Sequence, residues 1–558
     1  MSDDFSASYS DLLDGTYDCV DRLVLNAYNP LCASPGGFRT WWRRLMGGSD
    51  EDLDTAHLMR LAGRFSRRVR AFADAQGIPV IDCKTGERKH ELAEAYLREH
   101  PGVRGVFLIL VARAVAPVWE VERTPNGTIR NLAKKKAFVN HYSFHIMDPA
   151  WGHLTIKLSG HPPFGAQIIL NGHEYVASRG TKQGLGFTKE GNCFTQVDST
   201  VELAKVADTV SDARASGQLS QLCDRWIYTA CLCFGLSLDE QERSGFRYAY
   251  SVYQVEYSRN LLFTVGGQME QVFQDLVDRN RARLGLRQIR TIFGTQHRHL
   301  RARTGQRAPR VAATLERPVY SLTVFKLHVG QLTLKGYTKG ERVLRFEAIV
   351  HNTRELGCGR VIAKLPIIVA RLKAILDRAL RTLQWMDRAF VADETLDQLP
   401  LPSQLGKTRV GGIDLGRPRM RTVLTAIMAL ALTPRGFTAG ELTAKVQEIG
   451  GHAFRDYGVR QAAYDLKKLR AKQLVEKPEH SRRYQVPDDG LRTITALVVL
   501  REHVLKPLLA AASQPSAGTP LNPKLGRKPK TRSPIDEHYQ TLRRTMHALL
   551  DDLHLTAA

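Results

Sequence analysis

The sequence predicts a multidomain protein of α/β (mixed α+β) class with a mainly helical middle region. Three observations support this prediction. Strand-like and helix-like segments alternate over the first 140 residues or so, helical periodicity dominates residues 199–300, and three helices followed by two short strands occupy residues 420–486. A chain of 558 residues is also long enough for several domains.

The N-terminal part reads as strand, helix, strand, helix, strand. Residues 19–25, 78–81 and 103–111 are apolar enough for strands. Residues 53–76 carry an apolar stripe at helical spacing, and residues 91–100 form a shorter helical segment. We therefore expect an α/β sheet in this region.

The centre changes character twice. Residues 138–180 are rich in strand-forming segments, and residues 319–352 return to strands with a Lys339-Gly340 turn. A long helix is expected over residues 362–389, and the glycine- and proline-rich residues 400–419 read as a linker. These changes divide the chain into seven regions: an N-terminal α/β domain (1–137), a β-rich segment (138–198), a helical arginine-rich region (199–318), a β-hairpin with a long helix (319–399), a linker (400–418), the three-helix segment with its strands (419–490), and C-terminal helices with a basic proline-rich linker (491–558).

The charge of the chain indicates a polyanionic partner. Lys and Arg number 80 against 56 Asp and Glu, which gives a formal net charge of +24. Ten arginines and no acidic residue lie between positions 279 and 310, at Arg279, Arg281, Arg283, Arg287, Arg290, Arg298, Arg301, Arg303, Arg307 and Arg310. Arginine pairs with phosphate in bidentate fashion and stacks on bases, so nucleic acid is the expected ligand here.

The strongest local pattern lies near the C-terminus. A helix over residues 420–432 is followed by Thr438 and Glu441 in a capping-box arrangement, a second helix, and a third helix over residues 458–473. The third helix turns Val459, Ala463, Leu466 and Leu469 inward, and residues 474–477 and 483–486 then form two strands.

This segment resembles the winged helices of bacterial transcriptional regulators such as the multiple-antibiotic-resistance regulators. The resemblance covers about 70 of the 558 residues. It implies that the third helix enters a major groove and that its polar face contacts nucleic acid, with a basic tip between the strands. The implied contacts are Arg460, Gln461, Tyr464, Lys467, Lys468 and Arg482. A winged helix that docks another protein is the alternative.

A second constellation lies on the expected hairpin of residues 334–347. Lys335, Tyr337 and Lys339 alternate on one strand, as do Arg345 and Glu347 on the next, so each set shares a face. The pattern resembles strands of plasmid and phage replication initiators, which nick DNA with a metal, and Lys335, Tyr337, Lys339 and Arg345 are expected to contact nucleic acid. Asp21, Glu174 and Glu347 are accordingly a hypothetical carboxylate set for Mg²⁺ or Mn²⁺ in a nuclease. A structural ion pair on these strands is the favoured alternative.

Two other clusters admit both functional and structural readings. Five histidines, His141, His145, His153, His161 and His173, lie within 33 residues but without a recognised zinc spacing, so no metal site is assigned. Tyrosines and arginines interleave over residues 246–260. Such a segment suits stacking on unpaired bases, or equally an amphipathic core face.

Several segments together resemble a widespread group of uncharacterised bacterial proteins with a C-terminal winged helix. The segments that carry this resemblance are residues 17–24, 163–175, 191–195 and 343–347. We expect a cytoplasmic nucleic-acid-binding protein, as a mobile-element or ribonucleoprotein effector that binds RNA or DNA, without a membrane span. A metal-dependent nuclease or replication initiator and a winged-helix transcriptional regulator are the alternatives. The oligomeric state is left open.

Overall fold

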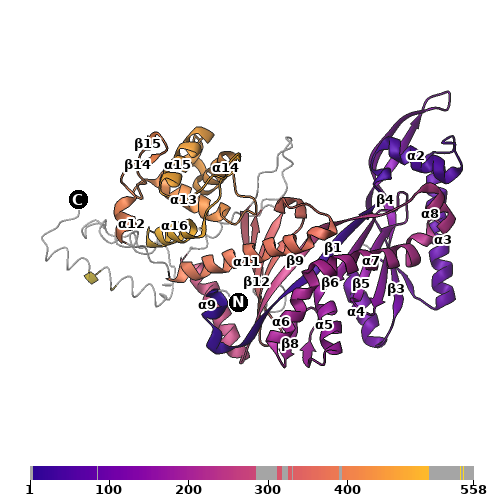
Figure 1. Cartoon of the computed structure of the whole chain (residues 1–558), viewed down its shortest axis with the longest axis horizontal. Coiled ribbons are helices and arrows are strands. Elements are labelled where there is room, and N and C mark those ends of the chain that lie inside the picture. The colour runs from indigo at the N-terminus through magenta and orange to yellow at the C-terminus, as the bar shows by residue number, and fades with distance from the viewer. Residues whose placement is uncertain are drawn as a thin grey trace, which may run out of the picture. The chain divides into compact units, whose positions relative to one another are not determined.

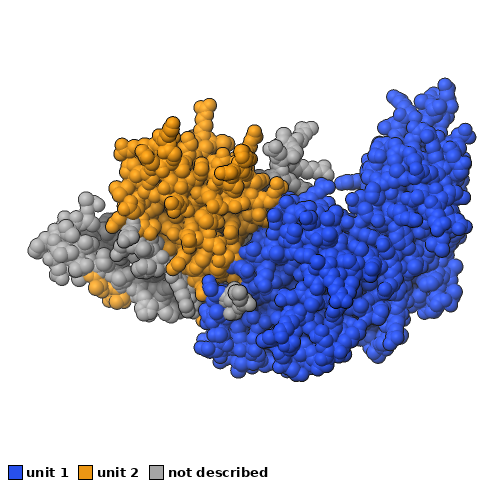
Figure 2. Space-filling view, in the orientation of Figure 1, with its two compact units in different colours: residues 1–273, 315–377 blue, residues 274–314, 378–558 orange. Residues whose placement is uncertain are grey.

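The computed structural model describes residues 4–84, 86–283, 311–316, 324–329, 331–388, 393–501, 541 and 544–545. The protein is of mixed α+β class. It divides into two compact units, of which unit 1 comprises residues 1–273 and 315–377, and unit 2 comprises residues 274–314 and 378–558 (Figure 2). No helix within the described ranges is both long and apolar enough to cross a lipid bilayer.

An eleven-stranded sheet, of which all strands but β10 lie wholly within unit 1, forms the framework of that unit (Figure 1). Neighbouring strands from β11 to β3 are antiparallel, and only β2 runs parallel to its neighbour β3 among the registers described. The order is β10 (Val311–Glu316), β11 (Val324–Val329), β12 (Leu332–Lys339), β13 (Val343–Val350), β9 (Ala249–Phe263), β1 (Leu13–Tyr28), β6 (Ala166–Asn171), β5 (Gly152–Ser159), β4 (Ile129–Asp148), β3 (Gly105–Arg123) and β2 (Val80–Asp82).

The expected strands are present, but they belong to one sheet. Strand β4 crosses the boundary expected at residue 137, and β1, β6, β9 and β13 lie side by side although the sequence places them in four regions. The described part of residues 199–300 is mainly helical, as expected, but β9, a strand of 15 residues that the helical periodicity does not predict, lies among the helices. Alternating tyrosine and β-branched residues favour this extended conformation.

Helices cover the sheet of unit 1. Residues Leu58, Phe65 and Val69 of the predicted amphipathic helix are buried, and the Phe65 ring lies 4.9 Å from that of Tyr142 on β4. The helices are α1 (Asp4–Ala7), α2 (Pro35–Met46), α3 (Thr55–Gln76), α4 (Lys89–Glu99), α5 (Gly172–Lys182), α6 (Thr200–Asp208), α7 (Ala213–Ala230), α8 (Leu238–Ser244), α9 (Gly266–Arg283) and α11 (Leu365–Arg388), the last two continuing into unit 2. A small hairpin, β7 (Phe187–Lys189) with β8 (Phe194–Val197), follows α5.

Unit 2 is mainly helical. Its elements are α12 (Asp393–Gln398), β14 (Ser403–Leu405), β15 (Thr408–Val410), α13 (Pro418–Leu430), α14 (Ala439–Gly450), α15 (Val459–Ala471) and α16 (Asp488–Leu500). Helix α14 packs against α13 and α15, and α16 packs against α13. The predicted capping box is confirmed, because Thr438 Oγ1 accepts from the Glu441 N–H and Glu441 Oε2 accepts from the Thr438 N–H.

Short extended segments complete unit 2. Phe437 bridges Tyr484, and Glu476 bridges Gln485. The segment expected as a linker, residues 400–418, instead contains the β14–β15 hairpin, which packs against α15. Glycine at position 406, with φ of +60°, provides the tight turn between the two strands.

Candidate functional site

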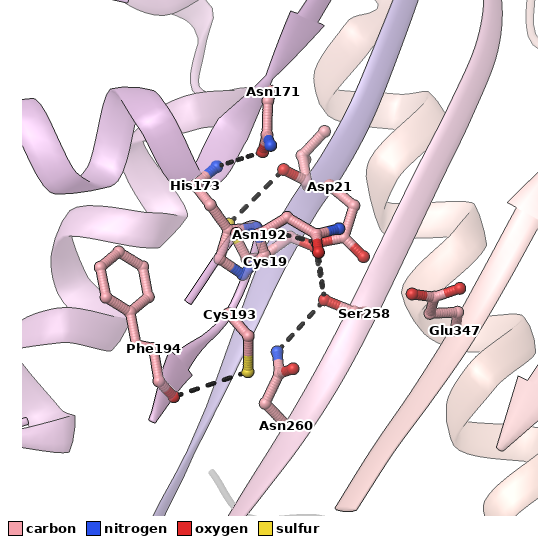
Figure 3. Close-up of polar contacts among 12 residues, drawn as sticks. Cys19, Asp21, Asn171, His173, Asn192, Cys193, Phe194, Ser258, Asn260 and Glu347 are labelled. Atoms are coloured by element: carbon pink, nitrogen blue, oxygen red, sulfur yellow. Dashed lines mark hydrogen bonds and ion pairs between the residues drawn. The ribbon is translucent and has the colours of Figure 1, made fainter. Parts of the chain in front are cut away.

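Polar side chains from four distant parts of the chain meet inside unit 1 (Figure 3). We call Asp21, His173, Ser258, Arg345 and Glu347 the buried polar cluster. Asp21 lies on β1, Ser258 on β9, and Arg345 and Glu347 on β13, while His173 is in the first turn of α5. The register of the strands explains their approach, because Ser258 pairs with Glu347 on one side and with Cys19 on the other.

Asp21 is the centre of this cluster. Its Oδ1 atom lies 2.5 Å from Arg345 Nη2 and 2.9 Å from His173 Nδ1. Ser258 Oγ donates to the same oxygen over 3.2 Å. None of these side chains is solvent-exposed, so the carboxylate is stabilised by protein groups instead of water.

The charges of the cluster follow from burial and pairing. Burial disfavours the charged form of Asp21, but Arg345 and His173 oppose this effect, and the net result is a lowered pKa for Asp21. Burial lowers the pKa of His173 despite its aspartate neighbour. The pKa of Arg345 is raised, because Asp21 and other neighbours outweigh its burial. Asp21 and Arg345 are therefore charged at neutral pH, and His173 is neutral.

Glu347 forms a second arm of the cluster. Its Oε1 accepts from Tyr337 Oη over 2.5 Å and lies 3.4 Å from Arg345 Nε. Its Oε2 lies 3.4 Å from Lys335 Nζ, and Lys339 contacts Asn192 Oδ1. The predicted shared face of these strands and the favoured structural ion pair are thus confirmed.

Two expectations for this region are corrected. Arg345 presents no surface to a nucleic acid, because every residue of β13 is buried and the Arg345 side chain is 0% exposed. Glu174 does not join Asp21 and Glu347, since its Oε1 pairs with Lys189 Nζ over 2.6 Å. Asp21 and Glu347 meet through Arg345, and no group of three potential metal-ligating side chains occurs among the residues described.

The histidines and the tyrosine–arginine segment also have internal partners. His145 Nδ1 lies 3.0 Å from His153 Nε2. On β9, Tyr257 donates to Asp18, and Arg259 pairs with Asp18 and Asp377. Tyr257 and Arg259 are therefore parts of the folded interior, which corresponds to the structural reading of this segment.

Sequence reasoning missed Ser258 and Asn192 as members of this environment. The signal for Ser258 is a small polar residue in a strand-forming segment, with Asn260 two residues further on the same face. The helical periodicity expected over residues 199–300 conceals that signal.

Helix α15 forms a second candidate site, in unit 2. Arg460, Gln461, Tyr464 and Lys467 are exposed on one face, and Lys468 Nζ lies 5.2 Å from the centre of the Tyr464 ring. The buried face of α15 differs in part from the predicted one, which consists of Val459, Ala463, Leu466 and Leu469. Val459 is 53% exposed, and Ala462, Asp465, Leu466 and Leu469 are the buried residues.

Asp465 is the only acidic residue of α15, and it points inward. Its Oδ1 lies 3.1 Å from Arg419 Nη2, and its Oδ2 accepts from Tyr457 Oη over 3.0 Å. The exposed face of α15 is therefore free of carboxylates. The β14–β15 hairpin, which packs against α15, carries the exposed basic residues Lys407 and Arg409. Arg482 is exposed between the bridged segments of Glu476 and Gln485.

Much of the arginine-rich segment lies outside the described residues. The backbone of α9 extends to Arg279, Arg281 and Arg283. Beyond the described residues lie Arg287, Arg290, Arg298, Arg301, Arg303, Arg307 and Arg310, and also the basic proline-rich stretch after α16.

No protein-family model, no curated protein and no solved structure matches this chain.

Proposed function

We propose that the protein binds nucleic acid through unit 2, in which α13, α14, α15 and the short extended segments act as a winged helix. The order of elements supports this proposal. A helix, the Phe437 segment, two helices, and the Glu476 and Gln485 segments follow one another, with bridges from Tyr484 to Phe437 and from Gln485 to Glu476. In a winged helix, the third helix is the one that enters the major groove.

The observation that carries the proposal is the charge of α15. Its exposed face presents Arg460, Gln461, Tyr464 and Lys467, whereas its only acid is buried and paired. Arginine and glutamine read base edges in the major groove, and lysine neutralises phosphates. Gln461 Oε1 accepts from the Gly458 N–H, so its amide NH₂ group is the part available to a base.

Duplex DNA is the ligand that this proposal favours. An α-helix fits the major groove of B-form DNA, whereas the major groove of an RNA duplex is too narrow. A mobile-element or ribonucleoprotein effector, a replication initiator and a transcriptional regulator would all use such a contact. The choice among them depends on the sequence that is bound.

The test is selection of duplex DNA from a randomised pool, followed by fluorescence anisotropy on the enriched duplex. We expect the variant Arg460→Ala/Lys467→Ala to bind at least tenfold more weakly. A matched control, Arg98→Ala/Arg104→Ala, removes two exposed arginines from unit 1 and is expected to retain the parent affinity. Equal losses of affinity in both variants would show that binding depends only on the net charge of the protein. Retained binding in the α15 variant would contradict the proposal. Enrichment of a structured RNA instead would redirect the function to RNA.

A further inference from the structure

Strands β3 and β4 extend as a long hairpin whose tip lies beside α2 (Figure 1). The tip is covered on one face. Trp119 stacks on Phe38 of α2, Lys134 donates to the Ala33 carbonyl, and Arg123 donates to the carbonyls of residues 50, 51 and 53. This covering ends before Pro117.

Six residues of the same face lie open next to the covered tip, and we call them the hairpin face. Cross-strand pairing joins them two by two: Arg113 with Asn140, Val115 with Phe138, and Pro117 with Lys136. All six side chains lie on one side of the strands, because residues two apart share a face. Each of the six is exposed.

The centre of the hairpin face is apolar. Phe138 is 66% exposed and Val115, directly opposite, is 51% exposed. An exposed aromatic ring paired with an exposed aliphatic residue forms an apolar surface. Contact of this surface with water is unfavourable, so covering it with a ligand would lower the free energy.

The margins of the hairpin face are cationic. Neither Arg113 nor Lys136 forms an ion pair with a described carboxylate, and Arg113 Nη2 donates only to the Phe138 carbonyl. The two residues lie on either side of Phe138, four residues apart along the strands, or about 13 Å. The nearest acids on this hairpin, Glu120 and Glu122, occupy alternate positions and so point to the opposite face.

We propose that the hairpin face binds single-stranded nucleic acid, with an unpaired base stacked on Phe138 and the flanking phosphates on Arg113 and Lys136. An aromatic platform between cations is the arrangement that binds single strands without sequence preference. A duplex would not serve equally well, because its bases are already stacked on one another. This inference goes beyond the duplex contact of α15 and rests on residues of unit 1 alone.

The test measures the affinity of the full chain for a fluorescein-labelled oligothymidine at low ionic strength. Phe138→Ala is expected to raise the Kd about tenfold, and Lys136→Glu to raise it further. Phe138→Trp restores a stacking surface, so it retains the parent affinity and its new indole fluorescence is quenched by the oligonucleotide. Leu238→Ala is the matched control, because Leu238 is a 69% exposed apolar residue of α8 in the same unit.

The outcomes separate this inference from the function proposed for α15. The Phe138 variants are expected to retain duplex binding, and Arg460→Ala/Lys467→Ala to retain oligothymidine binding. Equal affinities of the parent protein, Phe138→Ala and Leu238→Ala for oligothymidine would overturn the proposal, as would no binding by the parent protein. Labelled polyglutamate provides the last comparison. If it bound more tightly than oligothymidine, and if this binding depended on Phe138, the hairpin face would be assigned to an acidic protein and the proposal would be overturned. Circular dichroism of each variant checks that the fold is intact.

Discussion

Arg345 Nη2 lies 2.5 Å from Asp21 Oδ1, and the two side chains are 0% and 1% exposed. The two residues are 324 positions apart in the sequence. Their pairing connects β13 with β1 across β9, so the cluster couples strands that come from the two ends of unit 1. A charge left alone at this depth has no water to stabilise it.

Replacing Arg345 is therefore expected to destabilise unit 1 strongly. Arg345→Met leaves the buried Asp21 carboxylate without its cationic partner, and we expect a loss of about 3–5 kcal/mol in the free energy of unfolding. Urea denaturation followed by tryptophan fluorescence measures this loss. The double variant Asp21→Asn/Arg345→Met should lose less than the sum of its single variants, because it removes both charges.

An exposed ion pair provides the control for this prediction. Arg88 pairs with Glu91 over 2.7 Å on the surface. Arg88→Met is expected to leave the denaturation midpoint unchanged. A midpoint for Arg345→Met equal to that of Arg88→Met would show that the buried pair does not stabilise the sheet.

Stability is also expected to depend on pH through His145. Burial is the main cause that lowers the pKa of His145 to about 3 and that of His141 to about 4. An unfolded histidine titrates near pH 6.5, so below that pH the unfolded chain binds protons that the folded chain does not. The free energy of unfolding therefore falls as the pH decreases from about 6.5, by roughly 1.4 kcal/mol per pH unit for each such histidine.

Urea denaturation at several pH values between 7 and 5 measures this slope. We expect His145→Asn to reduce the slope, because the variant removes one of the histidines concerned. His90→Asn, at an exposed position of α4, serves as the control and should keep the slope of the parent protein. Parallel stability curves for the parent protein and His145→Asn would refute the assignment.

Local features of this fold could be predicted from the sequence. The capping box of Thr438 and Glu441 and the turn at Gly340, where φ is +58°, are determined by residues close to one another in the chain. The amphipathic helix α3 is predictable for the same reason, since its apolar stripe repeats at helical spacing.

The buried polar cluster could not be predicted in this way. Its formation requires β9 to lie between β1 and β13, and the pairing of antiparallel strands from distant regions leaves no local signal. The neighbours His173 and Glu174 illustrate the difficulty. The helical geometry directs the first to Asp21 and the second to Lys189, so the carboxylate predicted to join Asp21 was one position away from the residue that does.

The capping box of α14 gives a prediction for unit 2. Thr438→Ala removes the oxygen that accepts from the Glu441 N–H over 3.2 Å. We expect a loss of about 1 kcal/mol in the stability of the helical unit, measured by thermal denaturation followed by circular dichroism at 222 nm, the wavelength reporting helix content. Thr422→Ala, inside α13 with its hydroxyl bonded to the Pro418 carbonyl, is the matched control and should not lower the melting temperature. Equal melting temperatures for the two variants would show that the capping box does not stabilise the helical unit.

The salt dependence of duplex binding provides the last prediction. Phosphate contacts release counterions, so the logarithm of the binding constant falls linearly with the logarithm of salt concentration, by about 0.9 for each phosphate neutralised. Arg460 and Lys467 are exposed on α15 without a described carboxylate partner. If both contact phosphates, Arg460→Ala/Lys467→Ala reduces the slope by about 2. If Arg460 contacts a base instead, the single variant Arg460→Ala weakens binding of the selected duplex but keeps the slope, whereas Lys467→Ala reduces it by about 1. Unchanged slopes in all three variants, measured by anisotropy across a salt series, would exclude α15 from the phosphate contacts.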